Sequence, residues 1–141
     1  MKKLIIIRGL PGSGKSTIAN KMVADNPSYI HIETDMFFMK ENMKYEFDSN
    51  MIHRAHSWCL DTVKVFLYQD KTVIVSNTFT KMWEIAPYVE FCKKHNIEVE
   101  VITQTENFGS IHGVPELVMN NMRSRFETHE KILNGVLKIY S

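Results

Sequence analysis

Short apolar runs recur along the chain, and each predicts a strand of a sheet. The first run is continuously apolar, which is typical of a central parallel strand buried on both faces. The second alternates and is rich in β-forming residues, and the third is again fully apolar. The fourth alternates in a way that predicts an outer position with one wetter face. The predicted strands are residues 3–8, 29–33, 71–76 and 97–102.

Longer segments between these runs carry apolar residues every three to four positions, the spacing of a helix with one buried face. The predicted helices are residues 16–25, 50–69 and 83–94. Pro115 suits the start of a further helix, because a first-turn N–H has no partner within the helix. Residues 132–137 leave two alternatives open, a tight hairpin at Asn134-Gly135 or a fifth strand.

Strands that alternate with helices through short connections predict an α/β fold. We expect a three-layer sandwich, in which helices cover a central parallel sheet of four to five strands. The 141 residues are predicted to form one domain, residues 1–141, because this length can bury one sizeable core and no repeat or linker divides it.

The connection after the first strand carries the strongest chemical signal. Residues 9–16 follow the pattern G-x-x-x-x-G-K-S between a strand and a helix, which is the phosphate-binding loop in the context that it requires. The fold class therefore narrows to a P-loop NTPase-type sandwich. We expect Lys15 to contact the β- and γ-phosphates of ATP and the Ser16 hydroxyl to ligate Mg²⁺. The predicted nucleotide-binding residues are Gly9, Leu10, Pro11, Gly12, Ser13, Gly14, Lys15, Ser16 and Thr17.

Polar residues also follow the second and third strands. Thr34-Asp35 comes after the second, and Ser76-Asn77-Thr78 after the third. Ligands of open α/β sheets bind beyond the carboxyl ends of strands, so Asp35 is expected near the phosphates. Asp35 is thus a candidate metal ligand together with Ser16. Its alternative is a helix N-cap, and both interpretations can hold for one residue.

Composition narrows the classes of protein and partner. The chain is 44% hydrophobic and 23% charged, as soluble globular proteins are, and its net charge of +1 gives no basic excess for gripping long nucleic acid non-specifically. Cys59 and Cys92 stand in apolar surroundings, which predicts buried thiols in a reducing compartment. No run approaches the ~20 apolar residues of a membrane span, so we expect a cytoplasmic protein with no membrane partner.

Several motifs together resemble the small P-loop kinases of the polynucleotide 5′-hydroxyl kinase type, which include phage polynucleotide kinase. They are the phosphate loop, the Thr-Asp and Asn-Thr after the second and third strands, Tyr45-Glu46-Phe47, Ala55-His56-x-Trp58 and Ile111-His112-Gly113-Val114-Pro115. The resemblance covers nearly the whole chain. It implies that Asp35 is the general base, that Lys15 and Ser16 bind nucleotide and Mg²⁺, and that residues 112–115 end a lid.

The chain departs from that family at three places. The family's lid carries an arginine shortly before His-Gly-Val-Pro, whereas residues 106–110 contain none. Phe38 stands where the phage enzyme has a substrate-clamping arginine. Ser76-Asn77 stands where relatives have an aspartate, so the metal-side carboxylate is weakened or missing. Arg123 and Arg125, on the helix after the lid, are catalytic candidates in place of the lid arginine. Their alternative is a solvated helix face.

Two functions follow from these features. The first is ATP- and Mg²⁺-dependent transfer of a phosphoryl group to a nucleic-acid 5′-hydroxyl, a hydroxymethylated base or a nucleoside-like molecule. The near-neutral charge and Phe37-Phe38 favour a short or stacked acceptor, such as single-stranded nucleic acid, over duplex DNA. The second is a nucleotide-binding regulatory protein with little transfer activity. The sequence leaves the acceptor and the oligomeric state open.

Overall fold

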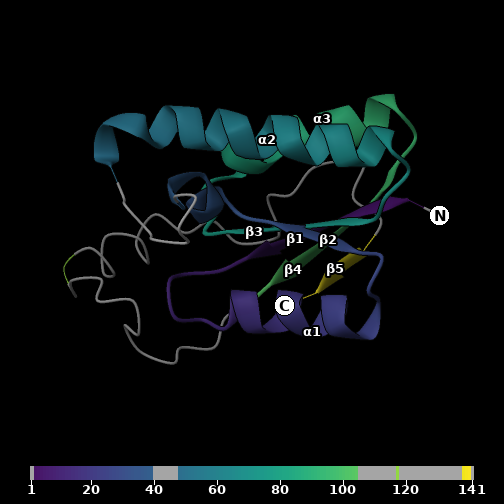
Figure 1. Ribbon diagram of the computed structural model, residues 1–141, viewed down its shortest axis with the longest axis horizontal. Coiled ribbons are helices and arrows are strands. Elements are labelled where there is room, and N and C mark those ends of the chain that lie inside the picture. The colour runs from purple at the N-terminus through teal and green to yellow at the C-terminus, as the bar shows by residue number, and fades with distance from the viewer. Residues whose placement is uncertain (1, 40–47, 105–116, 118–137, 141) are drawn as a thin grey trace.

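The fold is an α/β sandwich of three layers, in a computed structural model that describes residues 2–39, 48–104, 117 and 138–140. Figure 1 shows α2 and α3 above the sheet and α1 below it. The helices are α1 (Lys15–Asp25), α2 (Ile52–Tyr68) and α3 (Met82–Lys94), with two 3-10 helices, η1 (Thr34–Phe38) and η2 (Ser49–Met51). The three α-helices match the predicted segments to within two residues at each end. None of the helices in these ranges has the length and apolar character that a membrane crossing requires.

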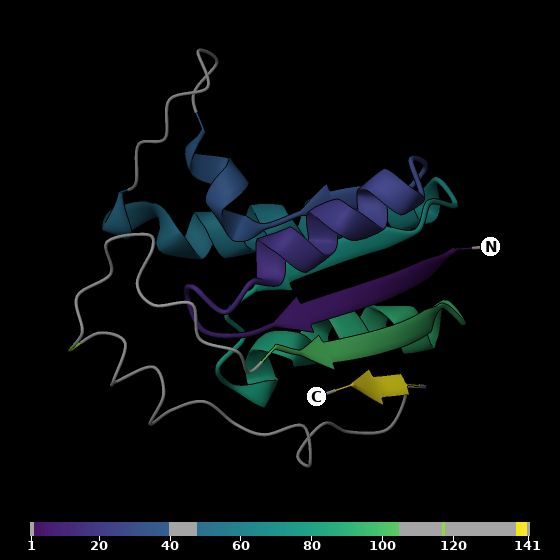
Figure 2. The same ribbon diagram turned by 90° about the horizontal axis from the view of Figure 1, so that it is seen from below.

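The sheet is entirely parallel, with the strand order β2-β3-β1-β4-β5 (Figure 2). Its strands are β1 (Lys3–Arg8), β2 (Ile30–Ile32), β3 (Val73–Asn77), β4 (Glu98–Thr103) and β5 (Lys138–Tyr140). The central position predicted for the first strand is confirmed, since β1 pairs with both β3 and β4. The parallel arrangement brings the carboxyl ends of all strands to one edge, where ligands of such sheets bind.

Strand alternation divides the core into two layers, one on each face of the sheet. Ile5, Ile7 and Ile74 pack against α1 through Ala19. The intervening positions of the same strands pack against α2 and α3, and this larger cluster includes Leu4, Ile6, Val73, Val75, Cys59 and Cys92. Both cysteines are free and buried, as predicted. A residue's strand parity therefore decides which helix layer it meets.

The edge of the sheet formed by β4 and β5 differs from the sequence prediction. The outer position expected for the fourth strand is wrong, because β5 lies beyond β4 and Val101 stands opposite Ile139. Glu100 is buried and its Oε1 lies 3.3 Å from Nζ of the partly exposed Lys3, so this polar position on β4 belongs to a partly buried ion pair. A fifth strand is present at Lys138–Tyr140, directly after the segment 132–137 for which the sequence predicts a strand or a hairpin. That segment, with the hairpin position Asn134-Gly135, lies outside the described residues.

Candidate functional site

The loop between β1 and α1 has a backbone that requires glycine at three positions. Gly12 and Gly14 have φ values of 80° and 93°, which other residues rarely adopt. A Cβ on Gly9 would lie 2.5 Å from Ser13 Oγ and 2.8 Å from the carbonyl oxygen of Gln104. The second of these atoms is backbone at the end of β4 and cannot move aside easily. The loop is thus folded tightly against the carboxyl edge of the sheet.

The N-terminus of α1 is left open toward this loop. Gly14 is its N-cap, no side-chain hydrogen bond caps it, and its first turn contains no acidic residue. The first N–H groups of a helix lack partners within the helix, and its dipole places partial positive charge there. Ser13 Oγ is also buried without a hydrogen-bond partner among the described residues. These donors fit the oxygen atoms of a bound phosphate group.

Lys15 lies across its own loop, where its Nζ donates a hydrogen bond to the Leu10 carbonyl oxygen at 3.1 Å. Burial lowers the pKa of Lys15, while the carboxylates of Glu33 and Asp35 act in the opposite direction. Both acidic side chains are therefore close enough to the ammonium group to interact with it electrostatically. Lys15 and Asp35 both lie at the carboxyl edge of the sheet, and the roles expected of them stay predictions.

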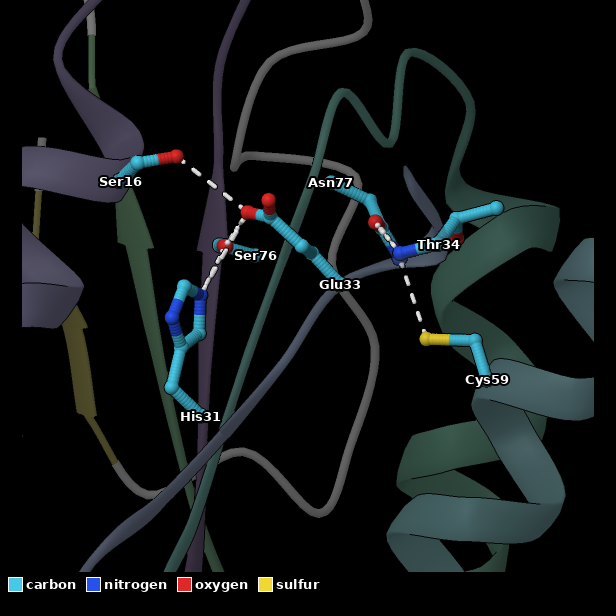
Figure 3. A network of polar contacts seen from close by, with 7 residues as sticks. All are labelled: Ser16, His31, Glu33, Thr34, Cys59, Ser76 and Asn77. Atoms are coloured by element: carbon cyan, nitrogen blue, oxygen red, sulfur yellow. Dashed lines mark hydrogen bonds and ion pairs between the residues drawn. The ribbon is translucent and has the colours of Figure 1, made fainter. Parts of the chain in front are cut away.

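Glu33 is the centre of a polar network at the ends of β2 and β3 (Figure 3). Its Oε2 accepts hydrogen bonds from Ser16 Oγ at 3.2 Å and from Ser76 Oγ at 3.1 Å. His31 Nε2 lies 2.6 Å from Ser76 Oγ. Because the Ser76 hydroxyl donates its proton to Glu33, His31 is the donor to Ser76. Burial lowers the pKa of His31 despite the nearby Glu33, which favours the neutral ring.

Strand register explains why these residues meet. His31 stands opposite Ile74, whose side chain packs against the α1 layer. Side chains two positions apart share a face of a strand, so Glu33 and Ser76 also point toward α1, where Ser16 begins the helix. Sequence reasoning treated His31 as a strand residue and assigned Glu33 no site role. The signal that could have found them is this parity, counted from the second and third apolar runs.

Asn77 faces the other helix layer and serves the framework. Its Oδ1 accepts a hydrogen bond from the Thr34 backbone N–H at 2.8 Å, and its Nδ2 donates to Cys59 Sγ at 3.6 Å. Asn77 is 9% exposed, so these contacts lie within the fold. The predicted ligand edge after the third strand is therefore divided, with Ser76 in the polar network and Asn77 anchoring η1.

Asp35 lies in the first turn of η1 and is exposed. Thr34 before it is buried, and so is Phe38 at the end of the same short helix. The Phe38 ring packs edge-on against Phe37 at a centroid distance of 5.4 Å. Phe38 is thus an anchor of η1, and a clamping contact like that of the arginine in the phage enzyme is absent at this described position.

The remaining predicted site residues lie outside the described residues. They are the catalytic candidates Arg123 and Arg125, the lid at residues 106–115, and the Tyr45-Glu46-Phe47 motif.

A cavity of about 340 Å³ lies between the first halves of α2 and α3, lined by His53, His56 and Trp83 among others. Trp58 of α2 instead contacts Phe37 of η1, with ring centroids 6.1 Å apart. Positions 56 and 58 of a helix point in nearly opposite directions, since each residue turns the helix by about 100°. The cavity therefore lies on the other side of α2 from the segment that carries Asp35.

A glycine loop of this geometry, between the central strand of a parallel sheet and its first helix, is the nucleotide-binding unit of P-loop domains. The element order is that of a small P-loop kinase, and the resemblance seen in the sequence is confirmed. Family comparison goes one step further. A model described as an AAA domain matches residues 4–129, and the chain belongs to this family.

Individual relatives agree with this assignment. Human NEDD4-binding protein 2 is 39% identical over 97 residues, which are 68% of this chain and only 5% of that protein. A chain in the structure of the Pnkp1/Rnl/Hen1 RNA repair complex is 16% identical, with a TM-score of 0.70 over 96% of this chain and 47% of that chain. Kti12 of Chaetomium thermophilum in complex with ADP-AlF3 is 13% identical, with a TM-score of 0.70 over 97% and 87%. At these identities the solved structures show the fold alone.

Proposed function

We propose that this domain transfers the γ-phosphoryl group of ATP to a hydroxyl of a nucleic acid or a nucleoside-like acceptor. The observation that carries the proposal is the placement of an exposed carboxylate, Asp35 in the first turn of η1, at the same carboxyl edge of the sheet as the phosphate loop with Lys15. A carboxylate near the γ-phosphate can accept the proton of an acceptor hydroxyl, which assists transfer to that hydroxyl.

Different residues would bind the phosphates, accept the proton and ligate Mg²⁺ in such a transfer. The open N-terminus of α1 and the loop N–H groups hold the phosphates, and Lys15 exchanges the Leu10 carbonyl for phosphate oxygens. Asp35 accepts the proton of the acceptor hydroxyl. The hydroxyl oxygen bonds to the γ-phosphorus as the bond from that phosphorus to ADP breaks and ADP leaves. Bound Mg²⁺ supplies charge neutralisation on the phosphate oxygens, and the Ser16 hydroxyl is an oxygen donor suited to it. The predicted ligand role of Asp35 stays a prediction.

The acceptor class rests on two supports. One solved structure with the same fold is a chain of the Pnkp1/Rnl/Hen1 RNA repair complex, and the motifs of this chain resemble those of polynucleotide 5′-hydroxyl kinases. The near-neutral charge of the chain favours a short or single-stranded acceptor over duplex DNA. Stacking of a base on Phe38, which the sequence suggested, is not part of this support, because that ring is buried in the fold.

The decisive experiment incubates the protein with γ-labelled ATP and a panel of nucleosides, 5′-hydroxyl oligonucleotides and hydroxymethylated DNA. We expect label on a nucleic-acid or nucleoside hydroxyl. Asp35→Asn should lower turnover about a hundredfold or more with little change in ATP affinity, because a base acts on the acceptor. Asp25→Asn, at an exposed aspartate that ends α1, is the matched control. Unchanged turnover in Asp35→Asn would remove Asp35 from the mechanism.

A regulatory nucleotide-binding protein is the second candidate. It is favoured by the end of β3, where Ser76 and Asn77 provide no carboxylate for a metal ion. The panel separates the two functions, since ATP binding without transfer to any acceptor would support regulation.

Arg123 and Arg125 are proposed to neutralise charge on the transferring group, since residues 106–110 contain no arginine. Changing each to Ala should reduce transfer well beyond its effect on the melting temperature. In the opposite direction, Phe108→Arg or Gly109→Arg should raise turnover. If neither removal nor insertion alters the measured rate, another group neutralises this charge.

A further inference from the structure

We propose that Glu33 takes the place of the carboxylate missing from β3 and holds, together with Ser16, the Mg²⁺ of the bound nucleotide. This inference rests on the proposed function and identifies its metal site. P-loop enzymes hold magnesium with the loop Ser or Thr and an acidic residue at the end of a neighbouring strand. Here β3 ends in Ser76-Asn77, and both Asn77 side-chain groups are engaged with Thr34 and Cys59.

The first support is the distance between the two proposed ligand atoms. Magnesium binds oxygen at about 2.1 Å with octahedral geometry, so adjacent ligands lie about 3 Å apart. Glu33 Oε2 lies 3.2 Å from Ser16 Oγ. Only a shift of a few tenths of an ångström separates the observed hydrogen bond from two adjacent positions around one ion.

The second support is the way in which Ser76 holds the carboxylate. β2 is the direct neighbour of β3, and Ser76 donates from the end of β3 to the same Glu33 oxygen at 3.1 Å. His31 Nε2 contacts the same Ser76 hydroxyl at 2.6 Å (Figure 3). The Glu33 carboxylate thus extends from β2 to the end of β3, the strand that carries the acidic residue in other P-loop enzymes. The hydrogen bonds between His31, Ser76 and Glu33 orient this carboxylate.

The third support is access. The Glu33 side chain is 27% exposed, and the described residues form no hydrogen bond to its second oxygen, Oε1. A magnesium ligand must remain open on the side of the ion, which also binds waters and phosphate oxygens. Glu33 has this open side while one of its oxygens is firmly oriented.

Asp35 is then left for proton transfer. The two carboxylates are two residues apart, but Glu33 faces the α1 layer at the end of β2, and Asp35 is exposed on η1. In the sequence, Asp35 was a candidate metal ligand from its position beyond a strand end, and the family resemblance implied that it is the general base. The geometry assigns the metal to Glu33 and the acceptor hydroxyl to Asp35.

The test measures metal binding directly, with Mn²⁺ as a paramagnetic probe and ADP as the nucleotide. Mn²⁺ is titrated into the ADP complex of each protein, and electron paramagnetic resonance measures the bound fraction. The wild type should bind Mn²⁺, and the affinity of Glu33→Gln for Mn²⁺ should be about tenfold or more weaker. ADP affinity in EDTA should stay close to the wild-type value. Glu90→Gln, at an exposed glutamate of α3, is the matched control. Asp35→Asn should retain wild-type Mn²⁺ binding.

A second variant tests the proposal even if Glu33→Gln disturbs the polar network around Ser76. The double variant Glu33→Gln with Ser76→Asp returns a carboxylate to β3 and should restore Mn²⁺ binding. Full Mn²⁺ affinity in Glu33→Gln, or its loss in Asp35→Asn instead, overturns the proposal. Failure of phosphoryl transfer in the wild type, with the metal result intact, would overturn only the proposed function.

Discussion

Lys15 shows how one residue can be held ready without a ligand. Its ammonium group donates to the Leu10 carbonyl at 3.1 Å, which partly replaces the hydration that burial removes. Glu33 and Asp35 favour its charged form. Burial nevertheless has the larger effect and lowers the pKa of Lys15. The side chain already lies beside the loop, and an incoming phosphate takes the place of the Leu10 carbonyl oxygen.

Lys15→Ala should lower ATP affinity about tenfold or more, equivalent to about 1.4 kcal/mol, because it removes the cation nearest the phosphates. Isothermal titration calorimetry measures this loss. Lys21→Ala, at an exposed lysine one helical turn and a half further along α1, is the control and should bind ATP as the wild type does. Equal affinity in Lys15→Ala would mean that the loop does not bind the nucleotide in the way described.

At the scale of elements, η1 depends on one side chain from another strand. Asn77 accepts the buried Thr34 N–H and also contacts Cys59 of α2, so β3, η1 and α2 meet at one residue. The orientation of η1, and with it the position of Asp35, follows from this contact as much as from the η1 sequence.

Asn77→Leu should lower the free energy of unfolding by about 1–3 kcal/mol, because a leucine of similar size leaves the Thr34 N–H buried without its acceptor. Urea denaturation measures this change. Asn20→Ala, at an exposed position of α1, should change stability far less. The rate of phosphoryl transfer is measured where both proteins are fully folded. A lower rate in Asn77→Leu under these conditions would show that Asn77 also positions Asp35.

Local signals predicted most of these elements, and the missed features depend on distant partners. The apolar run of β1 and the glycine loop are each complete within one segment, so a single pass along the chain finds them. Glu33 meets Ser16 and Ser76 across 17 and 43 residues, and only the neighbourhood of β2 and β3 brings them together. The position of β4 likewise depended on whether the distant tail would pair with it.

At the scale of the whole molecule, burial of a thiol links global stability to alkaline pH. Cys92 is fully buried, which raises its pKa to about 12 from a value near 9.0. The folded state therefore keeps a proton that the unfolded chain loses. The contribution to stability is complete below pH 9 and is lost progressively between about pH 9 and 12.

The unfolding free energy should accordingly fall with rising pH in this window, by up to about 1.4 kcal/mol per pH unit for this one group. Cys92→Ala should lower stability at neutral pH, because it leaves a cavity, and should show a shallower fall above pH 9. Urea unfolding at pH 7 to 10.5 measures both slopes. Parallel slopes for the two proteins would show that Cys92 does not titrate on unfolding.

The contact between Glu33 and Ser76 also has an evolutionary consequence. Ser76 donates to the Glu33 oxygen that is the proposed Mg²⁺ ligand. On that proposal, an acidic residue at the end of either adjacent strand would serve the same ion. The two positions should then vary together among relatives, so that sequences with Ser at position 76 carry an acid at 33 and those with an acid near 76 tolerate a neutral residue at 33. A family alignment would reveal this exchange. Relatives that lack an acidic residue on the third strand but carry one at the end of the second would then be candidate enzymes.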